Sequence, residues 1–133
     1  MNHDYLFVYG TLRRDINSEM YHLLARYGNF VGDASFQGKL YMVDYYPGLV
    51  PSHNPQDVVY GEVYKLSCPD TVLSRLDDYE ECGPKFSEPT EYVRRKQDVK
   101  LKTGEVICAW VYIFERPTVG LQLIESGDFL TKD

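Results

Sequence analysis

The alternation of apolar and polar positions in the first third of the chain predicts a strand, a helix and more strands. Residues 6–9 are aliphatic, aromatic or β-branched, the types that favour a strand, and Gly10 ends the run. Residues 18–27 repeat apolar side chains at helical spacing, and Gly28 closes that helix. Residues 30–43, interrupted by two glycines, then predict one or two strands.

The turn after the first strand has the character of an anion site. The main-chain N–H groups of Gly10, Thr11 and Leu12 would lack strand partners, and Arg13 and Arg14 follow them. Such N–H groups and guanidinium groups suit a carboxylate, and a glycine lets a ligand approach the main chain closely. The alternative interpretation is an ordinary strand and turn with two solvated arginines, because short glycine motifs often mislead.

Two extended pieces are predicted in the middle of the chain. Residues 45–51 combine a Tyr-Tyr-Pro-Gly turn signal with a short extended run. The tyrosines of this turn are equally consistent with a structural turn and with a pocket wall. Residues 58–66 predict a clear strand, in which Gly61 marks a bulge or a close approach and Glu62 is expected at the surface.

A second helix follows, and Ser67 is expected to cap it. Its apolar stripe is formed by Val72, Leu73, Leu76 and Tyr79. Because a helix advances about 100° per residue, Glu80 falls about 40° from the centre of this stripe and Glu81 about 140° away. Glu80 is therefore the carboxylate of this acidic segment that should point inward, unless it bends out to water at the helix end.

Glu80 also lies where Gly83 and Pro84 end the helix. Partial burial and the negative end of the helix both disfavour an ionised carboxylate, so we expect a raised pKa for Glu80. A carboxyl group with a raised pKa suits general acid–base work near neutral pH. The neighbouring Glu81 could raise that pKa further or compete for the same role.

The last third of the chain predicts a hairpin and a closing turn. Residues 92–101 and 105–114 form its two strands, joined by a turn at 103–104. The second strand is apolar on both faces, which places it centrally in a sheet or in a closed barrel with helices outside. In the tail, residues 124–129, a Gly-Asp turn is expected to bring Phe129 back onto the core.

Composition narrows the classes of protein. A chain of 133 residues fits one domain, residues 1–133, with a sizeable core. The net charge of -6 and the absence of a basic block argue against a nucleic-acid partner. No apolar run reaches membrane-spanning length, and no signal peptide opens the chain. Three cysteines without a C-x-x-C pair indicate a reducing, cytoplasmic location, and 12 tyrosines indicate a wet, aromatic-lined cavity.

An ordered set of short motifs resembles the gamma-glutamylcyclotransferase-like family, including its gamma-glutamylamine cyclotransferase branch. These motifs span nearly the whole chain: Tyr9-Gly10-Thr11-Leu12, Tyr46-Pro47-Gly48-Leu49, Gly61-Glu62-Val63-Tyr64, Leu76-Asp77-Asp78-Tyr79-Glu80, Tyr92-Val93-Arg94 and Ser126-Gly127-Asp128-Phe129.

The resemblance implies an α+β fold, a small mixed β-barrel flanked by helices with a cavity at one mouth. It also implies that the loop of Tyr9, Gly10, Thr11 and Leu12 holds a γ-glutamyl group through main-chain groups. The family's catalytic glutamate corresponds to Glu80, the residue that the helix wheel turns inward. Further expected wall residues of the pocket are Tyr46, Tyr92 and Tyr112.

The activity implied by the resemblance is intramolecular aminolysis. The α-amino group of a γ-glutamyl substrate attacks its own γ-carbonyl, forming 5-oxoproline and releasing an amine. Because the nucleophile belongs to the substrate, the chemistry needs no serine, cysteine, metal or cofactor from the protein, and a single carboxyl group can move both protons.

Two alternatives remain at this stage. A binding module could hold the same γ-glutamyl or amino-acid ligand without turnover, because fold does not fix function. Cys82 could act as a nucleophile, although the neighbouring glutamates would raise its thiol pKa. The identity of the leaving amine and the oligomeric state are not encoded in any pattern of the sequence.

Overall fold

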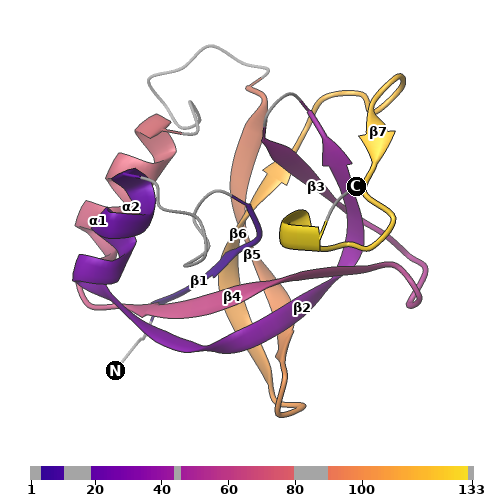
Figure 1. Cartoon of the computed structure of the whole chain (residues 1–133). Helices are drawn as coiled ribbons and strands as arrows, with labels where there is room; N and C mark the ends of the chain where they lie inside the picture. The colour runs from indigo at the N-terminus through magenta and orange to yellow at the C-terminus, as the bar shows by residue number, and fades with distance from the viewer. Residues whose placement is uncertain (1–3, 11–18, 44–45, 80–89, 132–133) are drawn as a thin grey trace.

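The computed structural model describes residues 4–10, 19–43, 46–79 and 90–131 (Figure 1). Its strands are β1 (Asp4–Val8), β2 (Gly28–Met42), β3 (Pro47–Pro51), β4 (Val58–Leu66), β5 (Tyr92–Leu101), β6 (Val106–Phe114) and β7 (Gln122–Leu123). Its helices are α1 (Glu19–Tyr27), α2 (Pro69–Tyr79) and the short 3-10 helix η1 (Phe129–Thr131). Within these ranges, no helix has the length and apolar character needed to cross a membrane.

Five strands close into a barrel. They follow the order β2-β4-β1-β6-β5, and β2 pairs with β5 to complete the ring. The β1–β6 pairing is parallel, whereas the other four pairings of the ring are antiparallel. The predicted fold, a small mixed barrel flanked by helices, is therefore confirmed. Strands β3 and β7 pair with the far half of β2, outside the ring.

Strand alternation divides the apolar side chains into two cores. In β6, Val111 and Ile113 belong to a cluster supplied by the strands and the tail, which fills the barrel. Tyr112 and Phe114 point the opposite way, into a second cluster that also receives side chains from both helices. Figure 1 shows α1 and α2 together on one side of the barrel. The apolar character of both faces of β6 follows from this arrangement, as its sequence predicted.

Three glycines explain how the chain turns and crosses. A side chain at Gly61 would strike the main-chain oxygen of Val8 and the ring of Phe7, so Gly61 marks a close approach between β4 and β1. Gly104 (φ +99°) forms the predicted hairpin turn, and Gly127 (φ +71°) forms the predicted turn of the tail. Beyond that turn, Phe129 is buried in the barrel core, as expected.

Two predictions about the second helix are wrong. The helix starts at Pro69, so Ser67 precedes the capping position, and the Ser67 hydroxyl donates instead to the Tyr27 carbonyl over 2.8 Å. Tyr79 is 48% exposed, because the buried stripe of α2 ends at Leu76. A third prediction, a surface position for Glu62, is also wrong, and that residue is described with the site below.

Candidate active site at the end of the first strand

The first strand ends against a proline from the β3 segment. A Cβ atom added at Gly10 would lie 2.7 Å from Cγ and 2.9 Å from Cδ of Pro47, well inside ordinary contact. Gly10 is therefore small because another segment packs on it, and its φ does not lie in the left-handed region. Thr11 and Leu12, the other predicted main-chain donors, lie outside the described residues.

Tyrosine side chains cluster beside this contact. The Tyr92 hydroxyl donates to the Pro47 carbonyl over 2.6 Å, and the rings of Tyr46 and Tyr92 lie 6.2 Å apart. The Tyr46 hydroxyl donates to the Glu91 carboxylate over 2.6 Å. The ring of Tyr92 also meets Phe114 edge-on, with 5.6 Å between ring centres. Two predicted wall residues thus lie together beside Pro47, the residue that packs on Gly10.

Tyr112 connects the end of β1 to the end of α2. Its main-chain oxygen accepts a hydrogen bond from the Tyr9 hydroxyl over 2.6 Å. Its own hydroxyl donates to Oδ1 of Asp77, in the last turn of α2, over 2.8 Å. Asp77 precedes Glu80 by three residues, and Glu80 itself lies outside the described residues. The structure thus joins the predicted substrate turn and the helix that leads to the predicted acid–base residue.

The four described tyrosines of the predicted site share one property. Their hydroxyl groups all donate to acceptors of the protein: two to main-chain carbonyls of other strands and two to carboxylates. Three of them are at most 7% exposed, and Tyr46 is half-buried. These hydroxyls therefore hold the wall of the site together.

Sequence reasoning missed Glu62, a buried carboxyl on the helix-covered face of the barrel. It is 1% exposed, and the Tyr64 hydroxyl donates to its Oε1 over 3.2 Å. In the register between β4 and β1, Glu62 is the partner of Val8. Leu6 is the partner of Trp110 in the parallel pairing of β1 with β6, so Tyr112, two residues further along β6, lies on the other side of Val8. A barrel with helices outside implies that this face of β4 is covered, so the alternation of β4 combined with that fold could have revealed the burial.

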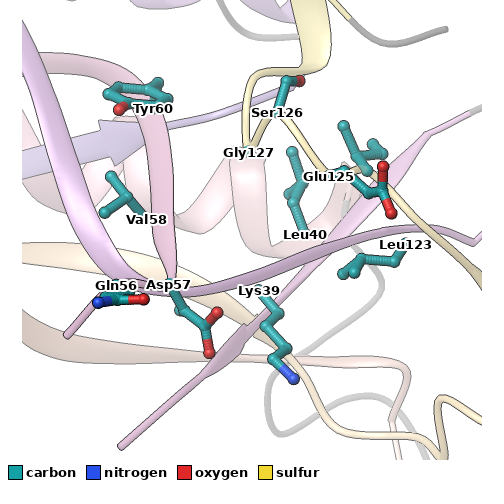
Figure 2. Close-up of a pocket in the computed structure, with 12 residues that line it drawn as sticks. Lys39, Leu40, Gln56, Asp57, Val58, Tyr60, Leu123, Glu125, Ser126 and Gly127 are labelled. Carbon is teal, nitrogen blue, oxygen red and sulfur yellow. The ribbon is translucent and has the colours of Figure 1, made fainter. Parts of the chain in front are cut away.

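The described residues also form a groove elsewhere, between β2, the turn before β4 and the tail (Figure 2). It encloses about 270 Å³ and is lined by Gly38, Lys39, Leu40, Gln56, Asp57, Val58, Tyr60, Leu123, Ile124, Glu125, Ser126 and Gly127. None of these is a predicted site residue. Its charged groups are of both signs, and Figure 2 shows that the Lys39 and Glu125 side chains do not converge on a common point.

The described part of the chain contains no group of three or more His, Cys, Asp or Glu side chains placed to hold a metal ion. The candidate site consists of the end of β1, the tyrosine cluster beside it and the end of α2. This site offers a ligand main-chain groups, aromatic rings and carboxylates.

Comparison with known proteins identifies the family of the chain. The family model described as "Gamma-glutamyl cyclotransferase, AIG2-like" matches residues 6–131. The gamma-glutamylcyclotransferase family protein YtfP of Escherichia coli K12 is 33% identical over 129 residues, covering 96% of this chain and 97% of that protein.

Solved structures show the same fold. The solution structure of ytfP from Escherichia coli superposes with a TM-score of 0.64 at 33% identity, covering 96% of each chain. An AIG2-like protein from Mus musculus superposes with a TM-score of 0.72 at 25% identity, covering 94% of this chain and 88% of that one. This chain belongs to the AIG2-like gamma-glutamyl cyclotransferase family.

Proposed function

We propose that the protein is a gamma-glutamylcyclotransferase that converts a γ-glutamyl amide into 5-oxoproline and a free amine, with Glu80 as its general acid and base. Family membership supports the reaction class. The observation that carries the assignment of roles is the position of Tyr112, which contacts both Tyr9 at the substrate turn and Asp77 at the end of α2.

The reaction balances without water or any external reagent. Glu80 takes a proton from the substrate α-ammonium, and the freed amine attacks the γ-carbonyl carbon to form a C–N bond. The carbonyl oxygen becomes an oxyanion, which the main-chain N–H groups of Gly10, Thr11 and Leu12 are proposed to stabilise. Glu80 gives its proton to the leaving nitrogen and takes a second proton from the ring nitrogen, and the original amide C–N bond breaks as the tetrahedral intermediate collapses. Glu80 then passes the second proton to the released amine, which leaves as an ammonium ion, and the carboxylate is regenerated.

The burial pattern of α2 favours Glu80 for this role. Its buried side chains are those of Val72, Leu73 and Leu76, whereas Tyr79 is half exposed. With Tyr79 removed from the stripe, continuing the helical wheel by one residue brings Glu80 to about 35° from the stripe centre. On this revised stripe, too, we expect Glu80 to point inward.

The tyrosine cluster is proposed as the wall that holds the γ-glutamyl chain curled. Tyr46, Tyr92 and Tyr112 supply ring surface, because their hydroxyls donate to the protein. Holding a flexible chain in its reactive conformation removes entropy before the chemical step, which can account for much of the rate of an intramolecular reaction. The free thiols of Cys68 and Cys108 fit work in a reducing compartment, the cytoplasm.

The decisive assay measures 5-oxoproline release from a panel of γ-glutamyl peptides and γ-glutamylamines. Glu80→Gln keeps the shape of the side chain but cannot accept the proton, so it should abolish release while preserving thermal stability. Glu81→Gln is the matched control and should retain activity, as should Cys82→Ser. Activity in Glu80→Gln together with loss in Glu81→Gln would contradict the assignment. Tight binding of a panel member without any release would instead identify a binding module.

A further inference from the structure

We propose that Asp77 is a positioning residue: Arg94 and Tyr112 clamp its carboxylate and thereby fix the end of α2, and with it Glu80, relative to the substrate turn. The proposal rests on the proposed function, because it concerns how the acid–base residue is placed. It adds Asp77 and Arg94 to the site and gives Tyr112 a further role, and the structure describes the contacts of all three.

The clamp has the geometry of a specific interaction. Arg94 donates from Nε to Oδ1 of Asp77 over 2.7 Å and from Nη2 to Oδ2 over 3.0 Å. Tyr112 adds a third donor to Oδ1 over 2.8 Å. A guanidinium fork on a carboxylate fixes orientation as well as distance, which a single point contact cannot do. The Asp77 carboxylate is thus held in one direction by two strands, β5 and β6.

The arginine is itself held in place. Its guanidinium lies over the ring of Trp110, 4.3 Å from the ring centre, and the indole Nε1 of Trp110 donates to Asp4 over 3.2 Å. The Arg94 and Asp77 side chains are only 22% and 18% exposed. Three other ion pairs have longer N···O distances of 3.6–3.8 Å, and the cation of each is at least 52% exposed: Arg95–Glu115, Lys96–Asp4 and Arg116–Glu91. The clamp therefore differs from an ordinary surface ion pair, which contributes little.

The position of Asp77 in α2 explains how the clamp would affect Glu80. The last buried apolar residue of α2 is Leu76, so apolar packing ends one residue before Asp77. Three residues of chain reach at most about 11 Å, so a fixed Asp77 limits how far the main chain of Glu80 can move from the clamp. Tyr112 also accepts the Tyr9 hydroxyl, so one residue of β6 sets both sides of the site.

A general base must lie within hydrogen-bond reach of the proton it removes, and a misplacement of about 1 Å can cost about 100-fold in rate. Asp77→Asn, Arg94→Gln and Tyr112→Phe should each lower kcat by about 10- to 100-fold and change KM much less. Arg94→Lys keeps the charge but loses the fork, so its kcat should also fall. The double variant Asp77→Asn/Arg94→Gln should be no worse than the poorer single variant, because both changes break one unit.

The pH profile separates placement from a simple charge effect. Removing the Asp77 charge leaves a cation near Glu80 and should lower its apparent pKa in kcat/KM, whereas Arg94→Gln should raise it. If the clamp acted only by charge, these opposite shifts would appear with an unchanged plateau of kcat. A lower plateau in both variants supports placement. Arg95→Gln, which breaks the exposed pair on the same strand, is the matched control and should keep the wild-type plateau.

Thermal melts of every variant test whether a lower kcat results from loss of the fold. If the wild type releases 5-oxoproline and Glu80→Gln does not, but all the clamp variants keep the wild-type plateau, the positioning role is refuted while the proposed function stands. If the wild type releases no 5-oxoproline from any substrate, both proposals are refuted together.

Discussion

Replacing Gly10 with alanine tests whether the close approach at the end of β1 matters to both fold and activity. The new Cβ would lie 2.7 Å from Cγ and 2.9 Å from Cδ of Pro47, whereas ordinary contacts begin near 3.4 Å. The mismatch is several tenths of an ångström against a rigid ring that cannot rotate away. Overpacking of this kind costs about 1–3 kcal/mol. For a domain of this size, we expect the melting temperature to fall by about 3–12 °C.

The same displacement should impair turnover, because Gly10 belongs to the turn proposed to hold the oxyanion. The assay combines thermal unfolding with 5-oxoproline release for Gly10→Ala and for Gly32→Ala. Gly32 is a matched control because a Cβ there meets nothing within 4 Å. We expect Gly32→Ala to stay within about 0.5 kcal/mol of wild type with full activity. Gly10→Ala should lose about 10- to 100-fold in kcat/KM.

A double variant tests whether contact with the Pro47 ring causes the loss of stability in Gly10→Ala. Pro47→Ala removes Cγ and Cδ, so Gly10→Ala/Pro47→Ala should be more stable than the sum of the single effects predicts, with a coupling energy of about 1–3 kcal/mol. The main-chain carbonyl that accepts the Tyr92 hydroxyl is retained in this variant. If Gly10→Ala behaves like Gly32→Ala, or if the two changes are simply additive, the packing argument is refuted.

Three further changes test the fold around the site by urea denaturation. Gly127→Ala places a side chain at φ +71° against a main-chain oxygen of β4 and should cost more than about 1 kcal/mol. Tyr64→Phe removes a donor to the buried carboxyl of β4 and should cost about 1–3 kcal/mol, whereas the exposed Tyr60→Phe should cost little. Leu76→Ala should cost about 2–5 kcal/mol, and Tyr79→Ala much less, if the buried stripe ends where the structure places it.

The elements of the barrel could be predicted because local signals agreed with the fold. Residues 106–114 are apolar on both faces, which predicts cover on both sides. The closed barrel with outer helices buries residues 111–114 in this way, whereas Val106 and Cys108 at the start of the strand are exposed. The hairpin turn at Gly104 and the tail turn at Gly127 both place glycine at positive φ, where the sequence led us to expect turns. In each case a short stretch carries enough information by itself.

The errors occur where a distant segment decides the outcome. Ser67 has the right chemistry for a cap, yet Pro69 is the first helical residue, and the hydroxyl instead finds the end of α1. Tyr79 continues the apolar spacing, but it lies at the edge of the stripe formed by the buried side chains of α2 and is 48% exposed. Glu62 is charged, and the alternation of β4 by itself does not show that the outer face of this strand is covered. Its burial follows only when the alternation is combined with a barrel that carries helices outside.

The tyrosines connect the composition of the chain with its candidate site. The abundance of tyrosine suggested a wet, aromatic cavity, and the described hydroxyls of Tyr9, Tyr92 and Tyr112 each donate to an acceptor on another segment. A hydroxyl that donates to the protein has no proton left for an oxyanion, so main-chain N–H groups are the better candidates for that role. These tyrosines would therefore act by rigidity: they hold the strand ends and the end of α2 in register, so that one carboxyl group can serve both proton transfers.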